Sequence, residues 1–190
     1  MAAATWETAA HPQPVCIDVA DEVGAAALCF VVERSGRVLA AQDRGGSWTV
    51  SDRFDRRRPV DVLVCGPSPL DARDAVEAFA RGEVGAVIRH DTPAQVVAAL
   101  DGLDHGLGLV PNDVLERARA APPITPRQRV VLEAVMAGQT NVEIAHALQL
   151  KPVTIKREVA ALFAALGACR RFELIAAGYD LGFRKRRART

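Results

Sequence analysis

Apolar positions in the last third of the chain repeat with the spacing of α-helices. Ile155, Val159, Leu162 and Leu166 lie at i, i+4, i+7 and i+11, so they share one face of a helix that begins at Pro152. The opposite face of this helix carries polar and cationic side chains. The same spacing and its punctuation predict three neighbouring helices: one from Pro126 to a stop at Gly138, one from Thr140 to Leu148, and a last one that contains residues 172–179.

Capping residues mark the starts of two of these helices. Thr125 is followed three residues later by Gln128, a pattern in which side chain and backbone cap each other. Thr140 and Glu143 repeat this pattern, and a three-residue turn then precedes Pro152. Two helices joined by such a turn, the second with cations near its start, fit a reader of the DNA major groove. The plainer interpretation is a small helical bundle whose charges form a solvated surface.

Several motifs lie in register along this part of the chain. They are a TPR-x-x-x-VL opening, AG-x-[ST]-N-x-EIA, T-[VI]-K in the helix after the turn, a terminal LG, and R-x-EL in the fourth helix. With these motifs, residues 124–182 resemble the LuxR-type helix-turn-helix domain of transcriptional regulators. The resemblance implies an all-α, four-helix domain that binds double-stranded DNA, and it favours DNA binding over the solvated bundle.

The resemblance also implies roles for individual residues. Thr154 and Lys156 would contact the DNA, and Arg157 would face base edges, which a guanidinium reads well in the major groove. The implied DNA-binding set is Thr140, Asn141, Thr154, Lys156, Arg157, Ala160 and Arg171. This sequence departs from the family pattern at Lys151 in place of a capping Ser or Thr, at Glu158 in place of His, and at Ala160 in place of a polar base reader. The target sequence is therefore not predicted.

The last helix carries more apolar residues than a small bundle needs. The LuxR family uses its fourth helix for dimerisation, so the resemblance implies a dimer, with a second copy or another regulator as the partner. The residues implied in this dimerisation are Phe172, Leu174, Ile175 and Tyr179. A two-fold dimer would place two recognition helices about one turn of DNA apart. The basic tail, residues 184–190, is expected to add phosphate contacts.

Short β-rich runs alternate with helical segments in the first two thirds of the chain. Strands are predicted over residues 15–19, 37–41, 60–65 and 85–89, and helices over 22–34, 70–81, 93–103 and 113–120. Residues 1–14 are expected to be a disordered leader. Residues 43–59 are expected to be loop, with at most one helical turn near 51–57, and the cations Arg56, Arg57 and Arg58 to be solvated. The alternation predicts an α/β domain with a parallel sheet.

A second resemblance concerns this α/β part. The run GAVIRHDTP, then a helix, then G-x-x-L-V-P, is similar to the end of the receiver domain that precedes LuxR-type domains in response regulators. We therefore expect an atypical receiver-like domain over residues 15–104, truncated by about one βα unit. This domain would be followed by a linker with a short helix over residues 105–123, the DNA-binding domain over 124–183 and the basic tail.

The resemblance to receivers also bears on phosphorylation. A receiver needs an acidic Mg²⁺ pocket, a phosphoacceptor Asp after its third strand, Ser or Thr on the fourth strand and Lys on the fifth. If residues 60–65 form the third strand, that strand ends at Cys65 without a carboxylate. The positions of this degenerate phosphoacceptor region are Asp18, Asp21, Cys65, Gly66, Arg89 and His90. We expect a domain that is not controlled by aspartyl phosphorylation.

Charge is divided unevenly between the two parts of the chain. The net charge is +7 over residues 124–190 and −6 over residues 1–123, although the whole chain carries only +1. A basic domain joined to an acidic one is the distribution expected of a DNA-binding module with a separate control domain.

Other features narrow the function class. The four cysteines form no C-x-x-C pair, so neither a metal nor a cofactor is expected. His90 and Asp91 are accompanied by no nucleophile elbow or Gly-rich phosphate loop, and we expect no enzyme activity. No apolar run reaches the roughly 18 residues that span a bilayer, which favours a cytoplasmic, nucleoid-associated protein without a membrane partner. RNA polymerase is a candidate partner.

Two alternatives remain open at this point. The chain could be an interaction module that binds DNA only with a partner regulator or after binding a small ligand. It could also be region 4 of a sigma factor, which shares the helix-turn-helix pattern, but the alternation of strands and helices over residues 60–103 argues against this class. Activation and repression are not distinguished by the sequence.

Overall fold

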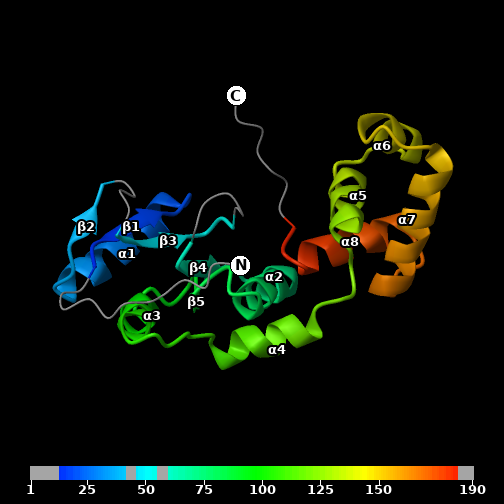
Figure 1. Ribbon diagram of the computed structural model, residues 1–190. Coiled ribbons are helices and arrows are strands. Elements are labelled where there is room, and N and C mark those ends of the chain that lie inside the picture. The colour runs from blue at the N-terminus through cyan, green and yellow to red at the C-terminus, as the bar shows by residue number, and fades with distance from the viewer. Residues whose placement is uncertain (1–12, 42–45, 55–59, 184–190) are drawn as a thin grey trace. The chain divides into compact units, whose positions relative to one another are not determined.

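The computed structural model describes residues 13–41, 46–54 and 60–183, and it divides into two compact units (Figure 1). An α/β unit ends at Arg119, and a helical unit begins at Ala120. Most of the predicted leader, the three arginines at 56–58 and the basic tail lie outside the described residues.

A parallel five-stranded sheet forms the centre of the α/β unit. Its strands are β1 (Val15–Asp18), β2 (Leu39–Ala40), β3 (Trp48–Ser51), β4 (Val62–Cys65) and β5 (Ala86–Arg89). Their order in the sheet is β2-β1-β3-β4-β5, and every neighbouring pair is parallel. This is a doubly wound order, in which the chain reverses direction across the sheet between β1 and β3. The predicted parallel α/β architecture is confirmed.

Helices cover both faces of the sheet. On one face, α1 (Glu22–Arg34) and α3 (Gln95–Asp104) pack on apolar side chains of all five strands, with Val50, Ile88 and Leu100 fully buried among them. On the other face, α2 (Pro69–Ala80) and α4 (Asn112–Ala120) pack on β4 and β5 through a second cluster that includes Leu63 and Val87. Each face thus has its own hydrophobic core.

The central strand contradicts the sequence-based prediction. The pattern assigns residues 43–59 to a loop, yet β3 lies in the middle of the sheet, and residues 51–54 contain no helical turn. Parallel strands are usually continuous apolar runs, whereas β3 alternates, with Thr49 and Ser51 as its polar positions. Residues 60–65 therefore hold the fourth strand and not the third.

The expected loss of a whole βα unit is also wrong, because all five strands are present. The chain is shortened in its connections. β2 and β3 are joined by seven residues and β3 and β4 by ten, fewer than the dozen or more of a usual helical crossover. The described residues of these two connections are not helical. On the face covered by α2, β3 presents its polar residues Thr49 and Ser51. The apolar core on that face is therefore formed by β4 and β5.

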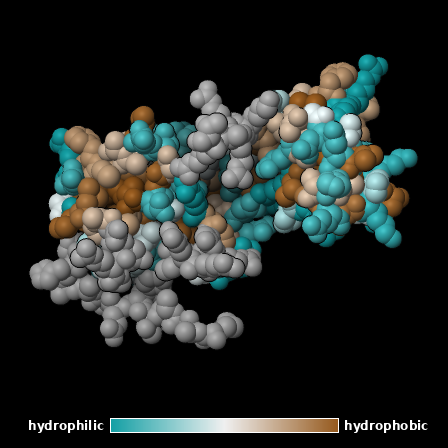
Figure 2. Space-filling model, turned by 90° about the horizontal axis from the view of Figure 1, so that it is seen from above, coloured by the Kyte–Doolittle hydropathy of each residue, from teal (hydrophilic) through white to brown (hydrophobic). Residues whose placement is uncertain are grey.

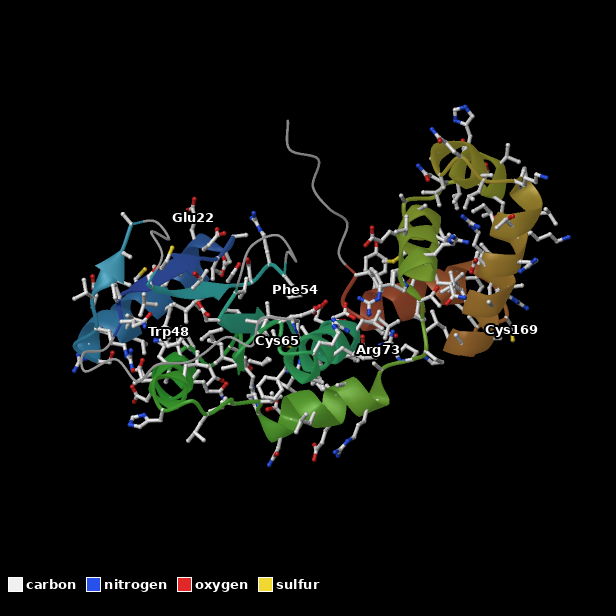
Figure 3. All side chains as sticks on the ribbon, viewed as in Figure 1. Glu22, Trp48, Phe54, Cys65, Arg73 and Cys169 are labelled. Atoms are coloured by element: carbon white, nitrogen blue, oxygen red, sulfur yellow. The ribbon has the colours of Figure 1, made fainter. Side chains whose placement is uncertain are left out.

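An ion-pair network around the buried Arg37 joins the β2 side of the sheet to α3. The Arg37 guanidinium lies 2.7 Å from a carboxylate oxygen of Asp101 and 2.5 Å from one of Asp104, while Trp48 Nε1 donates to the other oxygen of Asp104 at 2.8 Å. Burial alone lowers the pKa of Arg37, but the hydrogen bonds to the two carboxylates raise it above its usual value. Trp48 itself lies inside the unit, close to α3 (Figure 3).

The helical unit contains α5 (Pro126–Met136), α6 (Asn141–Ala147), α7 (Pro152–Leu166) and α8 (Arg171–Asp180), as Figure 1 shows. Both predicted capping boxes are present, Thr125 with Gln128 and Thr140 with Glu143. In the turn between α6 and α7, Gln149 has φ +53°, a left-handed conformation that lets the chain reverse within three residues. The predicted helix-turn-helix is confirmed.

Candidate nucleic-acid interface

One face of α7 is buried and fixes the orientation of the helix. Ile155 and Leu162 are fully buried and Val159 nearly so, and all three pack in a core with Val131, Leu132 and Ile144. These positions are the apolar stripe that the sequence predicts. Because the stripe faces α5 and α6, the opposite face of α7 lies on the surface of the unit.

The outer face of α7, defined here as Val153, Lys156, Arg157, Ala160 and Ala164, is exposed at every position. Thr154 lies at the edge of this face and is half-buried. Among the described residues, the side chains of Lys156 and Arg157 form no hydrogen bond or salt bridge. Two solvated cations on the exposed side of the second helix give the chemistry needed to bind phosphates or guanine edges.

Val153 is a surface residue that sequence reasoning missed. It occupies the second position of α7, and 62% of its surface is exposed. A valine two residues before the first residue of an apolar stripe is easily taken for part of the core. Two residues correspond to about 200° of rotation around a helix, so Val153 lies opposite the stripe, and this angular position could have identified it as a surface residue.

Two of the residues implied in DNA binding are also used within the unit. The hydroxyl of Thr140 accepts a hydrogen bond from the backbone N–H of Glu143. The carboxylate of Glu143 accepts from the backbone N–H and the hydroxyl of Thr140, and these two bonds lower the pKa of Glu143. Arg171 donates to the carbonyl of Gln139, between α5 and α6. Asn141 begins α6, and its side-chain oxygen is buried without a hydrogen-bond partner among the described residues.

The start of α7 has no side-chain cap. Lys151 occupies the N-cap position and makes no capping hydrogen bond, as its replacement of Ser or Thr leads one to expect. Pro152 compensates in part, since its fixed φ suits the first position of a helix and it has no N–H to satisfy. Glu158 is half-buried at the side of the helix and not on the outer face.

The residues proposed for dimerisation do not share one surface. Leu174 has no exposed surface and lies in the core of the helical unit, so it is not available for a dimer surface. Ile175 is half-buried and packs against that core. Phe172 and Tyr179 are 61% and 53% exposed and stand seven residues apart, on the same side of α8. Hydrophobic residues lie among hydrophilic ones on the visible face of the helical unit (Figure 2).

A second candidate site lies at the carboxyl end of the sheet, where doubly wound folds bind ligands. A cavity of about 440 Å³ is lined there by five of the six residues of the predicted degenerate phosphoacceptor region, Asp18 being the exception, together with Asp52, Asp71 and Asp74. Leu28, Leu63 and Ala75 add apolar surface. Phe54 and Cys65 lie at this edge (Figure 3).

Asp52 corrects the argument from a missing carboxylate. It directly follows β3, the true third strand, and its side chain accepts a hydrogen bond from the backbone N–H of Ala20 at 2.9 Å. Sequence reasoning overlooked it because β3 was not recognised as a strand. Asp52 therefore occupies the place that a phosphoacceptor would require.

The other positions of that edge differ from a phosphate site. Arg89 of β5 is paired with Asp91 at 2.5 Å and lies 3.6 Å from Asp113 of α4, and its hydrogen bonds lower the pKa of Asp91. Cys65 ends β4, and burial raises the pKa of its thiol to about 11. Gly66, next in the chain, offers no hydroxyl and uses its carbonyl to accept from Arg117 at 2.8 Å. In the described part of the chain, no three His, Cys, Asp or Glu side chains are grouped so that they could hold a metal ion.

Comparison with known proteins identifies the helical unit. Residues 122–177 match the profile of the family described as "Bacterial regulatory proteins, luxR family". A curated relative, the glycerol metabolism activator of Pseudomonas putida, is 26% identical over 141 residues, which cover 66% of this chain. The chain spans 64% of the length of that relative.

Solved structures with a similar fold cover both units. One is described as two RcsB dimers bound to two parallel DNAs, with a TM-score of 0.52, 14% identity and coverage of 88% of this chain and 98% of that one. Another is RcsB from Salmonella enterica serovar Typhimurium bound to promoter P1flhDC in the presence of phosphomimetic BeF₃⁻, with a TM-score of 0.50 and the same identity and coverage. At this identity the likeness concerns the fold. No helix in the described part of the chain is long and apolar enough to cross a membrane.

Proposed function

Residues 122–177 form a DNA-binding domain of the LuxR family, and we propose that the chain uses it as a sequence-specific, dimeric transcriptional regulator. The observation that carries the proposal is the exposed outer face of α7, with Lys156 and Arg157 opposite a fully packed core stripe. Thr140, Asn141, Thr154, Ala160 and Arg171 are proposed as accompanying DNA contacts. The place of action would be the bacterial nucleoid in the cytoplasm.

The direct test is selection of binding sites from random duplex DNA by the full-length, unphosphorylated protein, followed by titration of the affinity against salt. We expect the protein to select a two-fold symmetric site. The logarithm of its binding constant should fall linearly with the logarithm of the salt concentration, with a slope of about −0.9 for each phosphate contact. Only weak binding of equal strength to all sequences would contradict the proposal.

Dimerisation is proposed to use Phe172 and Tyr179 of α8. Both side chains expose large apolar area on one side of the helix, which a two-fold axis through that side would bury. Replacing both by Asp is expected to shift the protein from dimer to monomer in sedimentation velocity at micromolar concentration. Phe30→Asp is the matched control, because Phe30 is an equally exposed aromatic residue of α1. If Phe30→Asp made the dimer dissociate and the double variant did not, the dimer interface would lie in the α/β unit.

Independence from aspartyl phosphorylation is proposed on the residues around Asp52. The hydroxyl position after β4 is held by Cys65 and Gly66, and the cation of β5, Arg89, is already paired with two carboxylates of its own unit. Asp52→Asn is expected to leave the affinity for the selected site unchanged within about twofold, with or without acetyl phosphate or beryllofluoride. A tenfold tighter complex of the unmodified protein with beryllofluoride, lost in Asp52→Asn, would show that the domain is switched by phosphorylation.

A second version of the function is favoured by the cavity at the carboxyl end of the sheet. Its volume of about 440 Å³ and its mixture of apolar and acidic lining residues are suitable for a small molecule. In this second version, DNA binding requires the small molecule or a partner regulator, so the purified protein alone would select no DNA site. The name of the P. putida relative, a glycerol metabolism activator, suggests activation of transcription. RNA polymerase is proposed as a partner on that basis.

A further inference from the structure

The outer face of α7 has an apolar centre line. Ala160 follows Val153 by seven residues, about 20° short of two full turns, and Ala164 follows it by eleven, about 20° beyond three turns. All three are exposed. Lys156 and Arg157 lie on the two sides of this line, about 60° and 40° from Val153. The surface that faces away from the core is thus a narrow apolar strip between two cations.

Single exposed valines are common and need no explanation by themselves. Val153 differs in its position, since it stands in the first turn of the helix whose cations are proposed to bind DNA. The valine side chain has no hydrogen-bonding group. If it covered a donor or acceptor of a base edge, that group would lose its water and gain no partner in exchange. It gains only where the base edge is itself apolar. In unmodified DNA, the apolar group in the major groove is the C5-methyl of thymine.

We propose that Val153 is a specificity-determining residue that packs on a thymine methyl, and that Ala160 lies over a second one. The inference rests on the proposed DNA-binding function. Seven residues of helix span about 10 Å, and base pairs are stacked about 3.4 Å apart, so the two thymines stand about three base-pair steps from each other. Lys156 and Arg157 lie between them and read the intervening pairs, where guanine offers O6 and N7.

The experiment replaces each thymine of the selected half-site, one at a time, by deoxyuridine, which removes only the methyl group. The full-length protein is expected to lose affinity about fourfold at two positions some three steps apart, from the burial of one carbon each. Val153→Ala is expected to abolish the loss at one of these positions and to leave the other unchanged. Val38→Ala is the matched control, because Val38 is an equally exposed valine of the α/β unit.

Each outcome separates this inference from the proposed function. Any of three results overturns the role of Val153. Deoxyuridine has no effect at any position, the selected half-site has no thymines at that spacing, or Val153→Ala gives the same scan as the unmodified protein. In those cases salt-dependent binding to a specific site still supports the regulator. If the protein selects no DNA site, both the role of Val153 and the proposed function as a sequence-specific regulator are contradicted. Because deoxyuridine alters the DNA and not the protein, misfolding of a variant cannot produce the expected pattern.

Discussion

Replacing Lys156 and Arg157 together by alanine is expected to weaken binding to the selected DNA site at least thirtyfold. Each contact to a base edge contributes about 1–3 kcal/mol of discrimination, and both side chains are solvated in the free protein, so their loss costs nothing in folding. The measurement is fluorescence anisotropy with the selected duplex and with a scrambled duplex, each at several salt concentrations.

The matched control removes the same charge from the other unit. Arg34 and Arg81 lie at the ends of α1 and α2, and replacing both by alanine is expected to leave the affinity within about twofold. Comparable losses in the two double variants would mean that net charge, and not the outer face of α7, governs binding. An affinity unchanged by Lys156→Ala with Arg157→Ala would remove these residues from the recognition surface.

Asp104→Ala is expected to destabilise the α/β unit by about 2–4 kcal/mol. Asp104 accepts from both Arg37 and Trp48, and Arg37, whose side chain is only 5% exposed, would be left with one partner. Trp48 is buried in this unit, so urea unfolding followed by the fluorescence of Trp48 reports on it. A Trp6→Phe background isolates the signal of Trp48.

Asp101→Ala provides the comparison. Asp101 also contacts Arg37, at 2.7 Å, but its side chain is 60% exposed, so the pair is largely screened and its loss should cost less than about 1 kcal/mol. Equal losses in the two variants would show that the network acts through Arg37 alone. No loss in Asp104→Ala would show that solvent replaces its hydrogen bonds.

The sequence predicted best those elements whose signals are local. The helix over residues 22–34 was placed to the residue, and α7 begins at the predicted Pro152. Both capping boxes could be read from two residues each. Such features depend on neighbours within four positions, where propensity and hydrogen bonding are decided by the chain itself.

The features that could not be predicted depend on contacts between distant segments. β3 has the alternation and the β-forming Trp, Thr and Val of a strand, but it is only four residues long, and its pairing with β1 and β4 places it at the centre of the sheet. The place of Asp52 became visible only with β3. Leu174 and Phe172 are two positions apart on one helix, and only the packing of that helix decides that the first is buried and the second exposed.

The short connections around β3 leave the carboxyl edge of the sheet complete. β2 and β3 are joined by seven residues and β3 and β4 by ten, yet the sheet has five strands. Asp52 follows β3, Cys65 ends β4 and Arg89 ends β5, and all three line the cavity at that edge. A chamber of about 440 Å³ is therefore built from the ends of neighbouring strands and does not need a helix in every connection.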